Sequence, residues 1–296
     1  MNTVATLLVI GSAFMHATWN LLAKRSQDTY AFLWTISLVT LPIYAIPFAI
    51  SLWYHPIPAI GWAFILATGT IHCGYFTFLS NAYEHGALSV AYPLSRGTGV
   101  TLVAILAMPI LGEHISPTGG VGIGLILIGL ITLHWRTLTE LVRRNADDGE
   151  RLMPKQERLG IIFALLTGCT ICGYSLVDKA AVSHVFPVVY GYFIFVCLSI
   201  GLAPYMLLRR RDRVQREWRQ NRRAVLVGGV FVLGTYLIIL GAMRLAEVAY
   251  IVPLREVSVL IGTGYGIWLL GEGFARQRLA GAGLILAGVI LIGVFA

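Results

Sequence analysis

Three charged residues lie deep inside apolar stretches of this sequence, at Arg96, Arg255 and Glu256. Each follows a proline, Pro93 or Pro253, by two or three residues. A charge in apolar surroundings is costly unless a counter-ion or a wet cavity meets it. A guanidinium can also hold a carboxylate or a phosphate through two hydrogen bonds. These three residues are therefore the first candidates for a site that binds a polar ligand.

An internal duplication relates the three residues to one another. Residues 82–129 and 242–288 carry, in register, a Pro-Leu step, a Leu-Gly-Glu step and a glycine-containing apolar run. Aligned at the prolines, Arg96 corresponds to Glu256, whereas Arg255 corresponds to a serine. Equivalent positions of two inverted halves meet most easily near their pseudo-twofold axis. We therefore expect Arg96 to pair with Glu256, and Arg255 to bind an acidic group of a substrate.

Alternatives stay open for both arginines. The Arg96–Glu256 pair could serve only to hold two helices together, since buried charges in membranes are usually paired. Arg255 could pair with Glu84 or Asp178, or extend its side chain toward the membrane surface. In either case the charges would be structural and would bind no substrate.

Other polar and aromatic residues add to the candidate site. His16 and Asn20 are four residues apart and share one face of a helix. The simpler alternative is that such residues are hydrogen-bonded packing residues. Both His16 and His72 could also carry a coupling proton, because histidine titrates near neutral pH. The further candidates for a substrate-binding cavity are His16, Trp19, Asn20, His72, Tyr75, Tyr92 and Ser175.

The composition is that of an integral membrane protein. Of the 296 residues, 57% are hydrophobic and 12% are charged, and the mean hydropathy is +0.77. A soluble domain carries about 25% charged residues. The net charge of +8 comes from basic residues in the loops, so it marks topology and indicates no nucleic-acid partner. The partners we expect are the lipid bilayer and a small-molecule substrate, with no cofactor and no bound metal.

The pattern of apolar segments predicts an all-α fold with ten transmembrane helices. Five form a first repeat over residues 1–135, a polar linker covers 136–158, and five form a second repeat over 159–296. Glycines at every fifth residue of the fifth and tenth helices (119, 124, 129 and 283, 288, 293) should allow close helix packing. The predicted helices are 3–23, 30–52, 59–83, 87–111, 117–135, 159–179, 187–208, 224–244, 247–270 and 277–295.

The basic residues predict the orientation of these helices. Most of the 22 lysines and arginines fall in four alternate loops, which lie on one side of a ten-helix arrangement. Basic loops stay in the cytoplasm, so both termini should face outward. Each repeat has an odd number of helices, and the two repeats must therefore have opposite orientations, as in many secondary transporters.

Three classes of function can be weighed against these features. A secondary transporter working by alternating access fits the duplication and the buried charges. A membrane enzyme would need a nucleophile or metal cluster, and neither His-Glu-x-x-His nor Gly-x-Ser-x-Gly occurs. A sensor or accessory subunit should carry a sizeable soluble domain, whereas the longest predicted loop is the 136–158 linker. No nucleotide-binding motif is present to power transport.

The chain resembles EamA-type members of the drug/metabolite transporter superfamily. The resemblance rests on the proline and the Leu-Gly-Glu step of each repeat, the glycine-rich helix that follows, and His16-Ala17-Thr18-Trp19-Asn20, which is similar to bacterial members. It implies a bacterial inner-membrane transporter with a cavity lined by helices one, three, four, six, eight and nine. The small four-helix members carry a glutamate in helix one. Here that helix has His16 and Asn20, which puts multidrug export in doubt.

Overall fold

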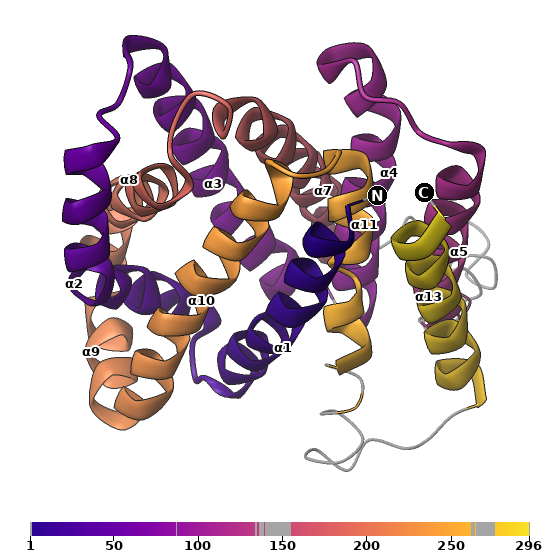
Figure 1. Ribbon diagram of the computed structural model, residues 1–296. Helices are drawn as coiled ribbons and strands as arrows, with labels where there is room; N and C mark the ends of the chain where they lie inside the picture. Colours follow the sequence, from indigo (N-terminus) through magenta and orange to yellow (C-terminus); the bar gives the residue numbers. More distant parts are fainter. Residues whose placement is uncertain are drawn as a thin grey trace.

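The computed structural model describes residues 2–86, 88–133, 135, 139, 155–261, 264 and 276–295, and every element in them is a helix (Figure 1). The helices are α1 (Thr3–Arg25), α2 (Thr29–Tyr54), α3 (Ala59–His85), α4 (Leu88–Leu111), α5 (Pro117–Leu133), α7 (Lys155–Ala181), α8 (Pro187–Arg209), α9 (Arg211–Gln220), α10 (Arg222–Met243), α11 (Val248–Leu254) and α13 (Arg276–Phe295).

The helices have the length and surface of membrane-spanning segments. Seven of those described are long and apolar enough to cross a bilayer, and two shorter apolar helices cover Pro117–Leu133 and Leu279–Phe295. Large apolar side chains such as Ile46, Leu66 and Leu208 lie exposed on the outside, where lipid would cover them. The all-helical membrane fold is thus confirmed, and the count of ten spans stays a prediction.

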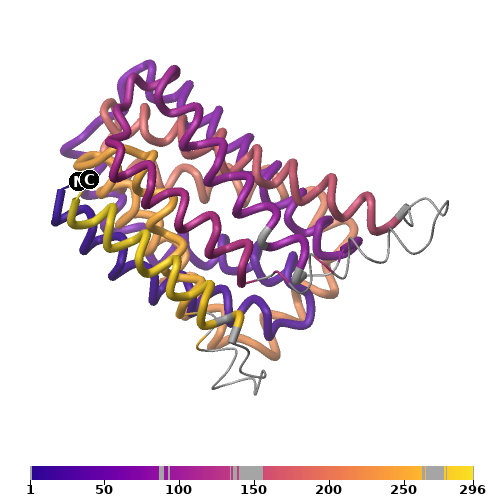
Figure 2. The backbone as a smooth tube through the Cα atoms, turned by 90° about the vertical axis from the view of Figure 1, so that its right-hand side faces the viewer, coloured from indigo at the N-terminus to yellow at the C-terminus, as the bar shows by residue number. Residues whose placement is uncertain are grey.

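The core lies between the two halves of the chain. Helices α3 and α4 pack on α7, α1 packs on α10, α2 on α8, and α5 on α13, so each of these contacts joins the first half to the second. Figures 1 and 2 show the two termini at one end of the molecule, with α9 toward the opposite end. A site near the centre of this interface is therefore formed by residues of both halves.

Helices α5 and α13 approach closely, and the contact uses Gly129 and Gly288 of the expected glycines together with Gly122 and Gly281. A Cβ on Gly288 would lie 2.5 Å from the carbonyl oxygen of Gly122, and one on Gly281 would lie 2.8 Å from that of Gly129. Gly124 and Gly283 have nothing within 4 Å. The contact glycines are seven residues apart, about two helical turns, whereas a five-residue spacing rotates off the face. The predicted close packing is therefore confirmed at Gly129 and Gly288, whereas Gly124 and Gly283 of the five-residue pattern lie outside the contact.

The repeated Leu-Gly-Glu step has a structural role in the first repeat. Gly112 follows α4 with a φ of +68°, a conformation that residues with a side chain rarely adopt. The turn directs Glu113 to the N-terminus of α11, where its two carboxylate oxygens accept from the Val248 and Ala249 N–H groups at 2.7 and 3.0 Å. The negative carboxylate satisfies two free donors at the positive end of the helix.

The ninth predicted helix, over 247–270, is interrupted within its described part. Helix α11 ends at Leu254, Arg255 and Glu256 form a turn, and helical structure resumes at Val257. Pro253 explains the break, because it has no N–H to donate and its ring disfavours a regular helix. The expectation of one continuous helix is wrong, and the interruption falls on two of the candidate site residues.

Candidate functional site

Arg96 of α4 and Glu256, just after α11, form a buried ion pair. Arg96 Nη2 lies 2.5 Å from Glu256 Oε1, and both side chains are almost inaccessible to solvent. The two residues occupy equivalent positions of the two repeats, so the predicted pair is confirmed. A carboxylate and a guanidinium that neutralise each other remove most of the cost of charge in the membrane interior.

The ion pair leaves polar atoms unsatisfied. Arg96 Nε and Glu256 Oε2 are buried and have no hydrogen-bond partner among the described residues, and the same is true of Trp19 Nε1 on α1. Such buried unsatisfied groups are uncommon in proteins, and each invites an explanation. Two donors and one acceptor, all on residues predicted for the site, can be satisfied by a polar ligand that carries both kinds of group.

Arg255 lies at the break that follows α11 and, unlike Arg96, has no counter-ion among the residues that the structure describes. Its side chain is buried, so it does not reach the membrane surface, and no carboxylate of the described residues pairs with it. The two alternative partners are engaged elsewhere: Glu84 pairs with Arg210, and Asp178 accepts from hydroxyl groups. Within the described chain, Arg255 therefore keeps an uncompensated charge.

Several predicted residues gather around the two arginines. The charge of Arg255 acts on His16, Tyr75 and Tyr92, and that of Arg96 acts on the same three. These three rings come from α1, α3 and α4, and they lie together in the region around Arg96 and Arg255.

Helix α1 also brings two more predicted residues to this region. His16 and Trp19 meet edge to face with ring centroids 5.0 Å apart. The Asn20 amide donates to the His16 carbonyl oxygen at 2.8 Å, which fixes it against its own helix. Asn20 keeps its side-chain oxygen for other contacts, and it is only partly buried.

Ser175 and His72 lie in other surroundings. Ser175 is fully buried, and its hydroxyl donates to the Ile171 carbonyl oxygen of its own helix at 2.6 Å. The Ser175 hydroxyl is therefore engaged in a hydrogen bond within α7. His72 stacks on Tyr174 at 4.4 Å between ring centroids, and Tyr75 meets the edge of the same tyrosine at 5.7 Å.

His72 belongs to a polar cluster that the sequence did not predict. Asp178 of α7 accepts from the hydroxyls of Thr68 and Tyr190 at 2.7 and 2.8 Å, and from that of Tyr236. His72 Nε2 lies 3.2 Å from the Tyr236 oxygen. The available sequence signal was an acidic residue within a predicted helix, but its partners come from α3, α8 and α10, which no periodicity relates.

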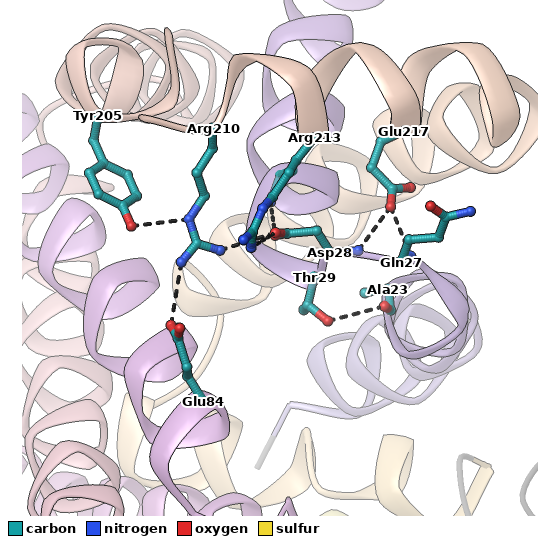
Figure 3. Close-up of polar contacts among 10 residues, drawn as sticks. Ala23, Gln27, Asp28, Thr29, Glu84, Tyr205, Arg210, Arg213 and Glu217 are labelled. Carbon is teal, nitrogen blue, oxygen red and sulfur yellow. Dashed lines mark hydrogen bonds and ion pairs between the residues drawn. The ribbon is translucent and has the colours of Figure 1, made fainter. Parts of the chain in front are cut away.

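A second, more exposed network ties the halves together at the α9 end (Figure 3). Arg210 Nη1 lies 3.0 Å from Asp28 Oδ2, Arg213 Nη1 lies 2.8 Å from the same oxygen, and Arg210 Nη2 lies 3.3 Å from Glu84 Oε2. The buried Glu217 of α9 accepts from the backbone of the α1–α2 corner. The basic segment that was counted as a loop between the seventh and eighth predicted helices therefore contains a docked helix, α9.

Asp28 is held ionised at this end. Burial alone would raise the pKa of its carboxyl, but the Ala31 N–H, the Arg213 hydrogen bond and the charge of Arg210 outweigh burial and lower the pKa. The carboxylate also caps the N-terminus of α2 through Ala31.

Comparisons with known proteins agree with this architecture. The model of the EamA-like transporter family matches residues 3–135 and 158–294. No curated protein matches the chain. A solved structure described as "Crystal structure of protein" aligns with a TM-score of 0.75 and 17% identity, over 99% of this chain and 98% of that one, which shows a shared fold. Members of the matched family are transporters and not enzymes. The chain therefore belongs to the EamA-like transporter family, and it is a multi-pass membrane transporter of the drug/metabolite superfamily.

Proposed function

We propose that this chain is a secondary transporter that moves a small polar metabolite, anionic or zwitterionic, by alternating access between its two repeats. The observation that carries the proposal is Arg255, a buried guanidinium without a carboxylate partner in the described chain. A cation at that depth is stabilised when an anionic group binds it. A substrate carboxylate or phosphate would supply that group.

The surroundings of Arg255 support a binding role. It lies where α11 is interrupted, and secondary transporters commonly bind substrates at such breaks near the bilayer midplane. The unsatisfied atoms of Trp19, Arg96 and Glu256 provide donors and an acceptor for the polar part of the ligand. On this view His16, Asn20, Tyr75 and Tyr92 line the cavity, whereas Ser175 and the Arg96–Glu256 pair chiefly hold it together.

The topology belongs to the same proposal. Ten spans in two inverted repeats, covering residues 1–135 and 159–296 on either side of the 136–158 linker, would place the basic helix α9 in the cytoplasm and both termini outside the bacterial inner membrane. Transport would be driven by an ion gradient, with a proton as the coupling ion. A C-terminal alkaline phosphatase fusion should be active, and an inactive fusion would contradict the orientation.

The substrate class can be tested by binding and transport. Purified protein would be screened for thermal stabilisation by glutamate, succinate and glycerol phosphate, with choline and glucose as cationic and neutral comparisons, because a ligand that binds only the folded state stabilises it. Compounds that stabilise the protein would then be tested for counterflow uptake in proteoliposomes. We expect the anionic or zwitterionic compounds to be active.

Arg255→Gln is the variant that decides the role of this residue. It should fold normally and bind anions about 10- to 100-fold more weakly, as expected for the loss of charged hydrogen bonds. Arg244→Gln, at an exposed arginine after α10, is the matched control and should bind normally. Stabilisation by choline or glucose alone, or unchanged anion binding in Arg255→Gln, would overturn the proposal.

A further inference from the structure

The Asp178 cluster holds a carboxylate that the proposed binding site does not use. Asp178 is 1% exposed and lies among α3, α7, α8 and α10. Its described contacts are hydroxyl groups, and its neighbour Lys179 turns away to the Met243 and Ala246 carbonyl oxygens at 2.7 Å each. A carboxylate in the membrane interior without a fixed cation is a functional candidate.

The geometry determines where the hydrogens of this cluster lie. The Thr68 hydroxyl has one hydrogen, which it donates to Asp178 Oδ1 at 2.7 Å. His72 Nδ1 lies 2.9 Å from the Thr68 carbonyl oxygen and 3.1 Å from its hydroxyl oxygen, and both can only accept from it. Nδ1 therefore carries a hydrogen, and in a neutral ring His72 Nε2 must be an acceptor.

Tyr236 then has one hydrogen for two acceptors, Asp178 Oδ2 and His72 Nε2. Without an added proton, one of these acceptors is unsatisfied and the cluster carries a negative charge. One added proton removes both defects. If an N–H bond forms on His72, the ring donates to Tyr236, which donates to Asp178. If an O–H bond forms on Asp178, the carboxyl group donates to Tyr236, which donates to His72.

We propose that Asp178, Tyr236 and His72 form a proton-binding site that couples transport to the proton gradient. This inference rests on the proposed function, and it assigns the coupling proton to a site that includes His72 and leaves out His16. The cluster joins α3 of the first half to α7, α8 and α10 of the second, so a change in its hydrogen bonds acts on the contact between the halves. A site shared in this way can link proton binding to alternating access.

The charges around the cluster determine how proton and substrate interact. The charges of Asp178 and Arg255 act on His72 in opposite senses, and that of Asp178 acts more strongly. An anion bound to Arg255 would cancel the opposing positive charge, so anion and proton should each strengthen the binding of the other. Among the described residues, the other titratable or charged groups next to the cluster are Tyr75 of α3 and Tyr174 of α7, whose rings contact His72, and Arg255, whose charge acts on it.

Infrared difference spectroscopy tests the proton site without a substrate. Purified ligand-free protein would be titrated between about pH 4 and pH 9, a range that covers ordinary and perturbed carboxyl groups. On acidification, a proton on Asp178 should give the C=O stretch of a buried carboxylic acid, and a proton on His72 should give the ring bands of a charged imidazole; either band should shift in D2O. We expect the band to be lost in Asp178→Asn and kept in the double variant Arg96→Gln/Glu256→Gln, which removes the other central carboxyl group. The absence of both bands, or a band that persists in Asp178→Asn, would overturn the proposal.

Tyr236→Phe keeps the test decisive if Asp178→Asn does not fold. It removes one donor to the carboxylate, so the midpoint of the band should move to higher pH by about one to two pH units. Tyr44→Phe removes a hydroxyl that donates to the Val230 carbonyl oxygen and serves as the matched control. An unchanged midpoint in Tyr236→Phe would contradict the proposal. Because the band needs no transported compound, failure of the substrate screen leaves this test intact, and the two proposals fail separately.

Discussion

The central ion pair and the network at the α9 end both join the two halves of the molecule, but they do so under different physical conditions. The Arg96 and Glu256 side chains are 8% and 0% exposed, and each has the other as its ionic partner. At the α9 end, Arg213 and Glu84 are 57% and 59% exposed, and Arg210 shares its guanidinium between Asp28 and Glu84 (Figure 3). Water can replace the contacts of Arg213 and Glu84 in the end network, whereas in the centre a lost partner leaves a bare charge.

The largest effect is therefore expected from breaking the central pair. Glu256→Gln leaves the Arg96 guanidinium uncompensated, which should cost about 3–5 kcal/mol of stability. The thermal unfolding midpoint in detergent should fall sharply, together with the yield of folded protein. Asp212→Asn, at an exposed residue of α9, is the control and should change neither quantity.

The double variant Arg96→Gln/Glu256→Gln separates a charge effect from a packing effect. It removes both charges and keeps similar side-chain sizes, so the unfolding midpoint should partly recover toward that of the unaltered protein. A double variant that is less stable than Glu256→Gln alone would show that the loss does not come from an uncompensated charge on Arg96.

A smaller effect is expected at the α9 end. Arg210→Gln removes contacts to Asp28, Glu84 and Tyr205, and should lower stability by about 1 kcal/mol. Arg213→Gln removes one contact of a largely exposed side chain, and should cost a few tenths of a kcal/mol at most, as exposed pairs do. Raising the salt concentration should narrow the difference in stability between Arg210→Gln and Arg213→Gln, because solvent-exposed ion pairs are screened. A larger loss from Arg213→Gln than from Arg210→Gln would contradict this order.

The smallest effect is a dependence on acid pH. The folded pKa of Asp28 is lowered, so its ionic contribution is complete above the unfolded value of about 4 and is lost as pH falls through the lowered folded value. Asp28→Asn retains a residue that can cap α2 and removes only the charge. The unfolding midpoints of Asp28→Asn and the unaltered protein should differ slightly at neutral pH and converge in acid. A difference between the two unfolding midpoints that widens in acid would show that the folded state does not favour the ionised form of Asp28.

The duplication made the centre of the molecule predictable. Counting from the two prolines was sufficient to pair Arg96 with Glu256, because equivalent positions of the repeats meet at the interface between the halves. Long apolar runs likewise predicted α1 to α5 closely, since bilayer thickness sets their length. These features depend on periodicity and offset, which a single sequence displays.

Other features depended on contacts that no local pattern shows. Helix α9 is short and highly charged, and its buried Glu217 docks on a corner nearly two hundred residues away in the sequence. Asp178 finds its hydroxyl partners on three other helices. The break after Pro253 was accessible from the sequence, because proline disfavours a helix interior, but the length of the apolar run outweighed it.

If transport occurs by alternating access, a water-filled binding site near Arg255 opens in turn to each side of the membrane. In a background in which Cys73, Cys169, Cys172 and Cys197 are replaced, Asn20→Cys should react with a membrane-impermeant maleimide applied to either side of oriented vesicles. An anionic substrate from the screen should slow that reaction.

The control residue for this measurement is Ser175, which the sequence placed in the cavity but the structure buries within the α7 packing. Ser175→Cys should stay unreactive from both sides. If Asn20→Cys is inert from both sides, or reacts from one side alone whether or not substrate is present, alternating access at this site is contradicted. A site that opens in turn to each side should react from both sides, and the anion should slow both reactions.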